Sequence, residues 1–177
     1  HSGWKGWCTN HSRSRHNRIS RMYPYLRHTI PSVRLAVVKA LHTFTTVQDL
    51  PRNDWMFNTF FALIFQNLVL EERADIRDLS FATFSSAVHA AENMDGALDV
   101  MVRPSLEEWY EIVMTPIGSK FDDTLFVKGG KASSGHNVDK HIMAGDLSLV
   151  PMETMLATRI AGAKALASLL KYFREVR

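Results

Sequence analysis

Three side chains near the start of the chain are of the types that bind zinc. Cys8, His11 and His16 offer one thiol and two imidazoles, but a structural zinc site takes four ligands, often arranged as two close pairs. His1 or His28 would have to complete the set. We therefore expect no bound metal at these residues.

A second group of polar side chains lies in a glycine-containing stretch further along. His136, Asp139 and His141 stand within six residues, yet no cysteine, serine or carboxylate pair lies at a spacing that would complete a metal or acid–base site. Residues 129–133 read Gly-Gly-Lys-Ala-Ser, whereas a nucleotide loop needs GxxxxGK followed by Ser or Thr, after a strand. Ala132 occupies the hydroxyl position, and no strand is expected before it. The sequence thus predicts no catalytic residue, no cofactor and no small-molecule substrate.

Charge is distributed unevenly along the chain. Residues 1–48 hold 8 Lys or Arg and no acid, while the rest holds 13 basic and 18 acidic residues. A basic end can contact phosphate or an acidic protein surface, although a solvated flank would look the same. The candidate partner-binding residues are the basic side chains Arg13, Arg15, Arg18 and Arg21.

Cysteine content and hydropathy bound the class of protein further. Cys8 is the single cysteine, so an internal disulfide is excluded and a reducing compartment fits. The most apolar stretch runs from Trp55 to Leu70 and includes four polar residues, whereas a membrane span needs roughly 20 mostly apolar residues. We expect a buried helix there and no membrane segment.

Much of the rest of the chain shows helical periodicity, whereas residues 1–17 and 115–150 show little or none. Helices are predicted at 18–28, 32–45, 55–70, 75–92, 94–102, 105–114 and 151–173. Asp54 is the expected N-cap of the third, and Ser105 with Glu108 forms a capping box for the sixth. The predicted division is a linker or extended arm at 1–17, HEAT-type helix pairs at 18–114, an irregular insertion at 115–150 and a HEAT-type helix at 151–177.

The irregular insertion has apolar residues near both of its ends. Ile117, Phe121, Leu125 and Phe126 lie on one side and further apolar residues lie at 138–150, whereas the middle, about 128–135, holds glycines, serines and lysines. We expect the ends to pack on the helices and the middle to stay mobile, because ordering it would bring no hydrophobic return.

An internal repeat predicts the fold. Ser32-Val33-Arg34 matches Asp75-Ile76-Arg77 at an offset of 43 residues. The eight residues from Arg34 share five identities with those from Arg159, at an offset of 125 that we interpret as three steps of about 42. HEAT and armadillo repeats have periods of about 40–47 residues. The sequence therefore predicts an all-α, HEAT-repeat α-solenoid segment with a long irregular insertion, and its opening without Met suggests a piece of a longer protein.

Two sets of residues resemble one family. The first is residues 21–30 (Arg-Met-Tyr-Pro-Tyr-Leu-Arg-His-Thr-Ile) with Ser32-Val33-Arg34, which resembles a HEAT repeat of the TATA-binding-protein-associated factors, Swi/Snf-type ATPases that remove TATA-binding protein from DNA. The second comprises 115–118, 125–126, 136–140 and 145–150, and is similar to that family's central conserved domain.

The resemblance implies a nuclear transcription regulator. TATA-binding protein would be its partner, promoter DNA would be reached through the parent protein, and the ATPase would lie elsewhere in that chain, because no helicase-type motif is present here. A generic HEAT-repeat adaptor of the transport-receptor type, or direct nucleic-acid binding through the basic first 48 residues, remain the alternatives.

Overall fold

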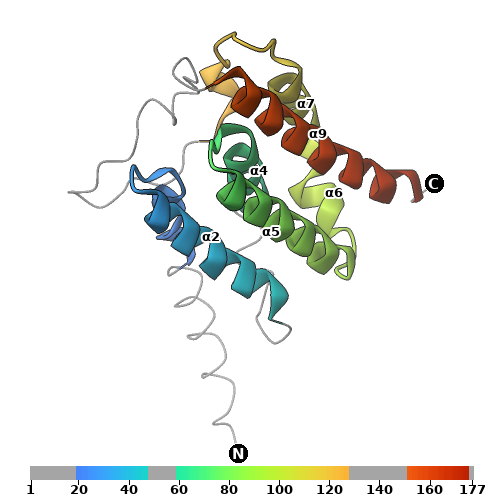
Figure 1. Ribbon diagram of the computed structural model, residues 1–177. Helices are drawn as coiled ribbons and strands as arrows, with labels where there is room; N and C mark the ends of the chain where they lie inside the picture. Colours follow the sequence, from blue (N-terminus) through green and yellow to red (C-terminus); the bar gives the residue numbers. More distant parts are fainter. Residues whose placement is uncertain (1–18, 48–58, 128–150, 176–177) are drawn as a thin grey trace, which may run out of the picture.

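The computed structural model describes residues 19–47, 59–127 and 151–175, and every regular element in these ranges is a helix (Figure 1). The expected all-α class is confirmed. No helix among the described residues is long and apolar enough to cross a membrane. The elements, in chain order, are η1 (Tyr23–Arg27), α2 (Pro31–Thr46), α4 (Phe60–Leu70), α5 (Ala74–Glu92), α6 (Ala97–Met101), η2 (Arg103–Ser105), α7 (Leu106–Met114), η3 (Asp123–Leu125) and α9 (Met152–Glu175).

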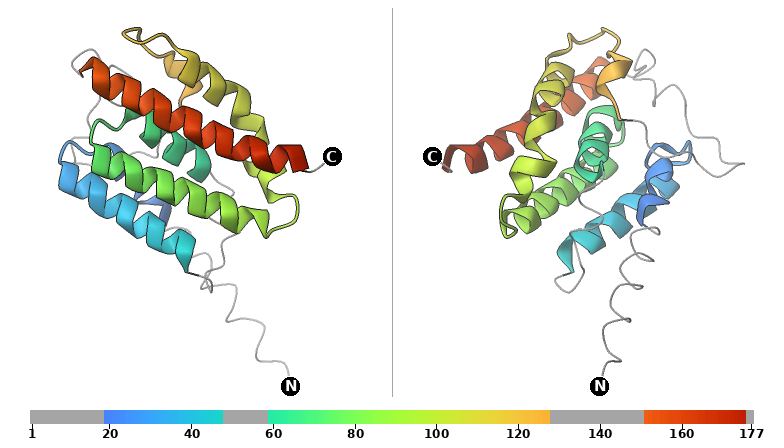
Figure 2. Two further views of the ribbon diagram at one scale, coloured as in Figure 1. Left: turned by 45° about the vertical axis from the view of Figure 1, so that its right-hand side comes forward. Right: turned by 180° about the vertical axis from the view of Figure 1, so that it is seen from behind.

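The helices form three stacked pairs. Within each pair the first helix packs on the second: η1 on α2, α4 on α5, and α7 on α9. The second helices α2, α5 and α9 also pack on one another in that order, and they run side by side in the same direction (Figure 2). This stacking is that of an α-solenoid, in which each pair buries its apolar face against its neighbours.

The stacking order corrects the repeat count. We interpreted the offset of 125 residues between Arg34 and Arg159 as three steps, but α5 packs on both α2 and α9. The offset therefore covers two steps. The excess length lies in the connection between α7 and α9, which is far longer than the connection between α4 and α5.

Helix α4 is the centre of the stack. Every residue from Phe60 to Leu70 is buried, as expected for a helix that is apolar on all sides. The helix α4 begins at Phe60, directly after Thr59, which adopts a left-handed conformation with φ of 48°. The predicted start at Trp55 lies outside the described residues. The expected N-cap, Asp54, lies outside the described residues.

An aromatic cluster joins the second and third pairs. Phe65 of α4 stacks on Trp109 of α7, with ring centroids 4.5 Å apart and an interplanar angle of 9°. Phe84 of α5 meets Trp109 edge-on at 5.9 Å and Phe65 at 6.3 Å. All three residues are buried, so this packing fixes α7 against the second pair.

One prediction at the helix starts was confirmed and one was wrong. Pro24, inside the predicted helix 18–28, predicts a kink or a late start, and residues 23–27 form a separate 3-10 helix with Pro24 in its first turn, where a missing N–H is tolerated. The predicted capping box at Ser105 was wrong. Ser105 precedes α7, but its side chain makes no capping hydrogen bond. The cause is the 3-10 turn η2, which already holds Ser105 in a helical conformation and directs its N–H to the carbonyl of Val102.

Helix α9 is covered on fewer sides than its composition suggested. Thr158, Arg159, Ala165 and Leu169 are buried, whereas Leu156, Ile160 and Leu170 are exposed. On the buried side, Gly162 lies where α9 crosses α4 and α7. A Cβ atom at Gly162 would lie 2.8 Å from Cγ2 of Val113 and 2.9 Å from Cγ1 of Val69. The absence of a side chain thus permits this close approach.

We expect Gly162→Ala to lower the free energy of unfolding by about 1–3 kcal/mol, because the new methyl group overpacks two stiff, β-branched neighbours. Overpacking should outweigh the gain of about 1 kcal/mol in helix propensity that Ala brings. Urea denaturation would measure the change. Val113→Ala in the same chain should restore part of the loss, and a more stable single variant would contradict the proposed crossing.

Candidate functional site: buried arginine clamps between helix pairs

An arginine near the start of each second helix binds the end of the first helix in the same pair. Each guanidinium donates a hydrogen bond to the backbone carbonyl of the residue that caps the C-terminus of that first helix. The pairs are Arg34 Nη1 with His28 O at 2.8 Å, Arg77 Nη1 with Glu71 O at 3.0 Å, and Arg159 Nε with Thr115 O at 3.3 Å. Helix C-termini leave carbonyls without intrahelical partners, so these bonds satisfy groups that would otherwise need solvent.

The same contacts locate the irregular insertion within the repeat. The arginine lies six residues after the capping residue in the first two pairs, and 44 residues after it in the third. The extra length is therefore an expansion of the turn inside the third pair. Arg159 nevertheless keeps the contact that its counterparts make, so α7 and α9 pair as α4 and α5 do.

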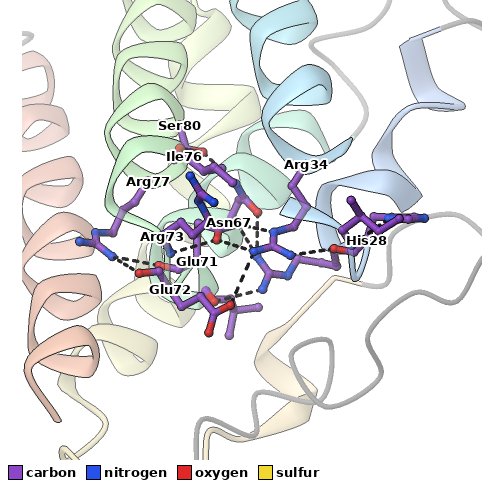
Figure 3. Close-up of polar contacts among 12 residues, drawn as sticks. His28, Arg34, Asn67, Glu71, Glu72, Arg73, Ile76, Arg77 and Ser80 are labelled. Carbon is purple, nitrogen blue, oxygen red and sulfur yellow. Dashed lines mark hydrogen bonds and ion pairs between the residues drawn. The ribbon is translucent and has the colours of Figure 1, made fainter. Parts of the chain in front are cut away.

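Glu71, at the C-terminus of α4, binds an arginine of the preceding pair (Figure 3). Both of its carboxylate oxygens accept from Arg34, Oε2 from Nε and Oε1 from Nη2, each at 2.9 Å. Oε1 also accepts from the backbone N–H of Arg73 at 3.1 Å. Glu71 is fully buried and Arg34 nearly so, so this two-point contact joins the first and second pairs in a water-poor setting.

A second arginine completes the network. Arg27 of η1 donates to Oδ1 of Asn67 at 2.9 Å and to the carbonyl of Leu70 at 3.1 Å, and it lies 3.5 Å from Oε2 of Glu71. The amide of Asn67 in turn donates to Oγ of Ser80 in α5 at 2.8 Å. The network thus extends from η1 through α4 to α5 (Figure 3).

The charges in this network explain its geometry. Two guanidinium groups share one buried carboxylate, and their other N–H groups face backbone carbonyls at the C-termini of η1 and α4, which carry a partial negative charge. A buried charge without such partners would be strongly unfavourable. The stacking of the first two pairs therefore tolerates little displacement, because any shift would leave a charged group unpaired.

Arg159 has a different environment from Arg34. Its guanidinium carbon lies 3.9 Å from the ring centroid of Phe121, in the first part of the insertion. No carboxylate among the described residues pairs with it, and its buried Nη1 has no hydrogen-bond partner there. Burial lowers the pKa of Arg159 to about 10. A cation–π contact therefore stands where the first pair has an ion pair.

The first part of the insertion packs on the first helices, as predicted for that end. Phe121 is buried and meets Phe126 at 5.4 Å between ring centroids. With its amide oriented to satisfy both groups, the buried side chain of Gln66 in α4 donates to the carbonyl of Val127 and accepts from its N–H. Ile117 is exposed and is not an anchor, contrary to expectation. Residues 128–150, including the other predicted anchors and the predicted mobile middle, lie outside the described residues.

Fewer basic side chains of residues 19–47 are exposed than the composition suggested. Among the basic residues of 1–48, Arg27 and Arg34 are buried in the Glu71 network, while Arg21 and Lys39 are exposed. Of the candidate partner-binding residues, only Arg21 is described, since Arg13, Arg15 and Arg18 lie outside the described residues.

The candidate metal and nucleotide residues are mostly beyond the described part of the chain. Cys8, His11 and His16 lie outside it, as do 129–133 and the group His136, Asp139 and His141. His28 is described, and its Nδ1 accepts a hydrogen bond from the N–H of Ile30 at 3.1 Å. Within 19–47, 59–127 and 151–175, no group of three or more His, Cys, Asp or Glu side chains could hold a metal ion.

Sequence reasoning missed the polar residues of α4. Gln66 and Asn67 within α4, and Glu71 at its C-terminus, each bind a residue distant in sequence. The only sign of this in the sequence is the presence of polar residues in and just after an otherwise apolar stretch. That signal shows that a buried polar group needs a partner. It does not identify the partner.

The fold and the three arginine clamps, in which Arg34, Arg77 and Arg159 bind the end of the preceding helix, define the class of protein. It is an α-solenoid segment of HEAT-type helix pairs held together by buried arginines. The chain belongs to a family described as "Domain of unknown function (DUF3535)", whose family model matches residues 83–177.

Known proteins similar to this chain are TATA-binding protein-associated factors. The TATA-binding protein-associated factor MOT1 of Saccharomyces cerevisiae is 27% identical over 89% of this chain and 10% of its own length. An Aspergillus fumigatus relative is 29% identical over 86% of the chain and 10% of its own length. The human factor 172 is 26% identical over 71% of the chain and 7% of its own length. The predicted family resemblance is confirmed, and the chain spans about a tenth of the length of these relatives.

We expect Glu71→Gln to lower the free energy of unfolding by about 3–5 kcal/mol, because it leaves the buried Arg34 and Arg27 without their shared carboxylate. The neighbouring Glu72→Gln is a matched control: its carboxylate lies 3.8 Å from Arg34 and is half-exposed, so its loss should matter by less than about 1 kcal/mol. Denaturant melts of both variants would measure the difference. Equal effects would show that the contact with Glu71 does not hold the pairs together.

The repeat offers a comparison of two arginines at equivalent positions. Arg34→Met should cost about 3–5 kcal/mol, because Glu71 stays buried with only a weaker partner. Arg159→Met should change stability by less than about 1 kcal/mol, since removing an unpaired buried charge offsets the lost hydrogen bond and ring contact. Thermal or urea unfolding of the two variants tests the ranking, and a larger loss in Arg159→Met would reverse it.

Proposed function

We propose that this chain is a non-catalytic scaffold segment of a transcription regulator that binds TATA-binding protein and helps an ATPase elsewhere in the same polypeptide to remove it from promoter DNA. The observation that carries the proposal is the match to proteins named TATA-binding protein-associated factors over 86–89% of the chain. A nuclear location follows from the same proposal.

The geometry supports a scaffold role rather than a chemical one. The polar side chains that are best placed for chemistry, Arg27, Arg34 and Glu71, are buried and already bound to one another. Their contacts fix the spacing and angle of successive helix pairs. A rigid segment of this kind can hold the parts of a long protein at fixed relative positions, which suits the proposed scaffold role.

The insertion supports the same role. Its first part runs from the end of α7 over α4, where Gln66 binds the backbone of Val127, and Phe126 packs against the core. Contacts that join residues of different pairs stiffen the array against bending between them. We therefore assign this part of the insertion to bracing.

The test compares two kinds of substitution in the natural full-length polypeptide. Glu71→Gln should impair capture of TATA-binding protein and its ATP-driven removal from promoter DNA, because the spacing of the pairs is lost. Reversing the charge of the exposed basic side chains described in residues 19–47, with Arg21→Glu and Lys39→Glu, should leave both activities within about two-fold of the parent if the segment acts by spacing and not by phosphate contact. Pull-downs and gel-shift assays with purified components provide the readouts.

Circular dichroism melts of the same variants serve as the control for folding. A folded Arg21→Glu, Lys39→Glu variant that no longer captures TATA-binding protein or DNA would make this surface a contact site and contradict the spacing role. A Glu71→Gln variant that unfolds locally yet keeps full activity would contradict the scaffold role itself.

A further inference from the structure

The residue that caps the C-terminus of each first helix occupies the same position in every pair. These residues are His28 after η1, Glu71 after α4 and Thr115 after α7. Each offers its backbone carbonyl to the arginine of its own pair. Glu71 also uses its side chain, because its carboxylate binds Arg34 of the preceding pair. For the side chain of Thr115, the counterpart of Arg34 is therefore Arg77.

Arg77 lacks the carboxylate partner that Arg34 has. It is buried, and its Nη1 donates to the carbonyls of Glu71 at 3.0 Å and Glu72 at 3.3 Å. No carboxylate among the described residues lies within ion-pair distance of it. Figure 3 shows its side chain pointing away from Arg34, toward the side where α9 packs on α5. Within the described part of the chain, the contact between the second and third pairs thus has a buried cation and no anion.

Thr115 has the position and the exposure to acquire a negative charge. Its side chain is half-buried, and its hydroxyl donates to the carbonyl of Glu111 at 3.1 Å on the exposed side of α7. Residues 116–120 are all exposed. Of the six prolines in the sequence, only Pro116 follows a serine or a threonine. Because a residue before proline is confined to extended conformations, Thr115 has φ of −56° and ψ of 126°. An accessible, extended Thr-Pro dipeptide is what proline-directed protein kinases recognise.

Covalent geometry makes phosphothreonine a close replacement for glutamate at this position. The phosphorus atom of phosphothreonine is as many bonds from Cα as the carboxylate carbon of glutamate is. The phosphate carries a charge of about −1.5 to −2 at pH 7 and three acceptor oxygens, which suit the donors of a guanidinium group. A phosphate on Thr115 therefore has the reach that the carboxylate of Glu71 uses to bind Arg34.

We propose that Thr115 is a phosphorylation site for a proline-directed protein kinase and that its phosphate binds Arg77. In this reaction the hydroxyl oxygen of Thr115 forms a bond to the γ-phosphorus of ATP while the bond from that phosphorus to the β-phosphate oxygen breaks, and ADP leaves. The hydroxyl proton passes to the catalytic aspartate of the kinase. Phosphorylation then joins the second and third pairs by the kind of contact that joins the first and second. This inference rests on the repeat register and not on the proposed function.

The local charges decide whether a phosphate is tolerated at the end of α7. A helix C-terminus carries a partial negative charge, which repels a phosphate. The carboxylate of Glu71 stands in the same place at the end of α4, where guanidinium groups outweigh that repulsion. Beside Thr115, Arg159 adds a second guanidinium, with Nε at 3.3 Å from the carbonyl and a buried Nη1 that has no partner among the described residues. The surroundings of Thr115 are therefore positively charged before phosphorylation.

The first experiment tests the register without a kinase. Thr115→Glu and Thr115→Gln are made in the natural full-length polypeptide, since these two side chains have the same size and differ in charge. Amide hydrogen exchange of residues 112–121, followed by mass spectrometry, should be about five-fold slower in Thr115→Glu than in Thr115→Gln, because the carboxylate binds Arg77. Equal rates, or faster exchange in Thr115→Glu, would overturn the proposed contact.

The second experiment tests the modification itself. The full-length polypeptide is incubated with ATP and a cyclin-dependent kinase as the proline-directed probe, and peptide mass spectrometry locates the phosphate. We expect phosphate on Thr115 of the folded protein and at least about ten-fold less of it in Pro116→Ala, which keeps the hydroxyl but removes the recognised proline. Thr115→Val should take up no phosphate in the same peptide. A folded parent protein without phosphate on Thr115 would overturn the site.

The last comparison identifies the group that holds the phosphate. Hydrogen exchange of residues 112–121 is measured before and after phosphorylation, in the parent and in Arg77→Met. Because each variant is compared with itself, its own change in stability cancels. Phosphorylation should slow exchange about five-fold in the parent and leave it unchanged in Arg77→Met. Equal slowing in both would overturn Arg77 as the partner, and faster exchange in the phosphorylated parent would show that the phosphate disrupts α7. The Thr115→Glu and Thr115→Gln pair keeps the proposal testable if Arg77→Met does not fold.

Discussion

The stacking of the first two helix pairs depends on one buried carboxylate. Glu71 ends α4, accepts two hydrogen bonds from Arg34 and lies beside Arg27, so it joins three elements at a single point. Apolar packing between helices allows them to slide with modest loss, whereas a shift here would strand charges away from water. The carboxylate therefore fixes the register, and the apolar contacts of α2, α4 and α5 supply most of the stabilising area.

Local periodicity was enough to predict most of the helices. The predicted helices at 32–45, 75–92 and 105–114 differ from α2, α5 and α7 by at most one residue at each end. Their burial patterns repeat every three or four residues, so each segment carries its own signal. The all-round burial of α4 was also predictable, because a helix without a polar face requires neighbours on every side.

Two features that the sequence did not predict depend on contacts distant in sequence. Glu71 and Arg34 are 37 residues apart, and nothing in either local pattern pairs them. The repeat count failed for the same reason: an offset of 125 residues fits three regular steps as well as two steps and an expanded turn, and only the packing of α5 against α9 decides. At Ser105 the capping pattern was present, but the preceding 3-10 turn took over its role.

The expanded turn in the third pair shows which constraint a helix pair must keep. Arg159 still reaches the carbonyl of Thr115 across 44 residues, so the pair needs the clamp but not a short connection. Loop-closure entropy rises only slowly with loop length, which makes such an expansion tolerable. Among the described residues, Arg159 has no carboxylate partner like Glu71. Instead, the ring of Phe121 in the insertion covers the guanidinium of Arg159. The insertion thus supplies part of the packing for the pair that it interrupts, and in return the Arg159 contact fixes where the insertion starts.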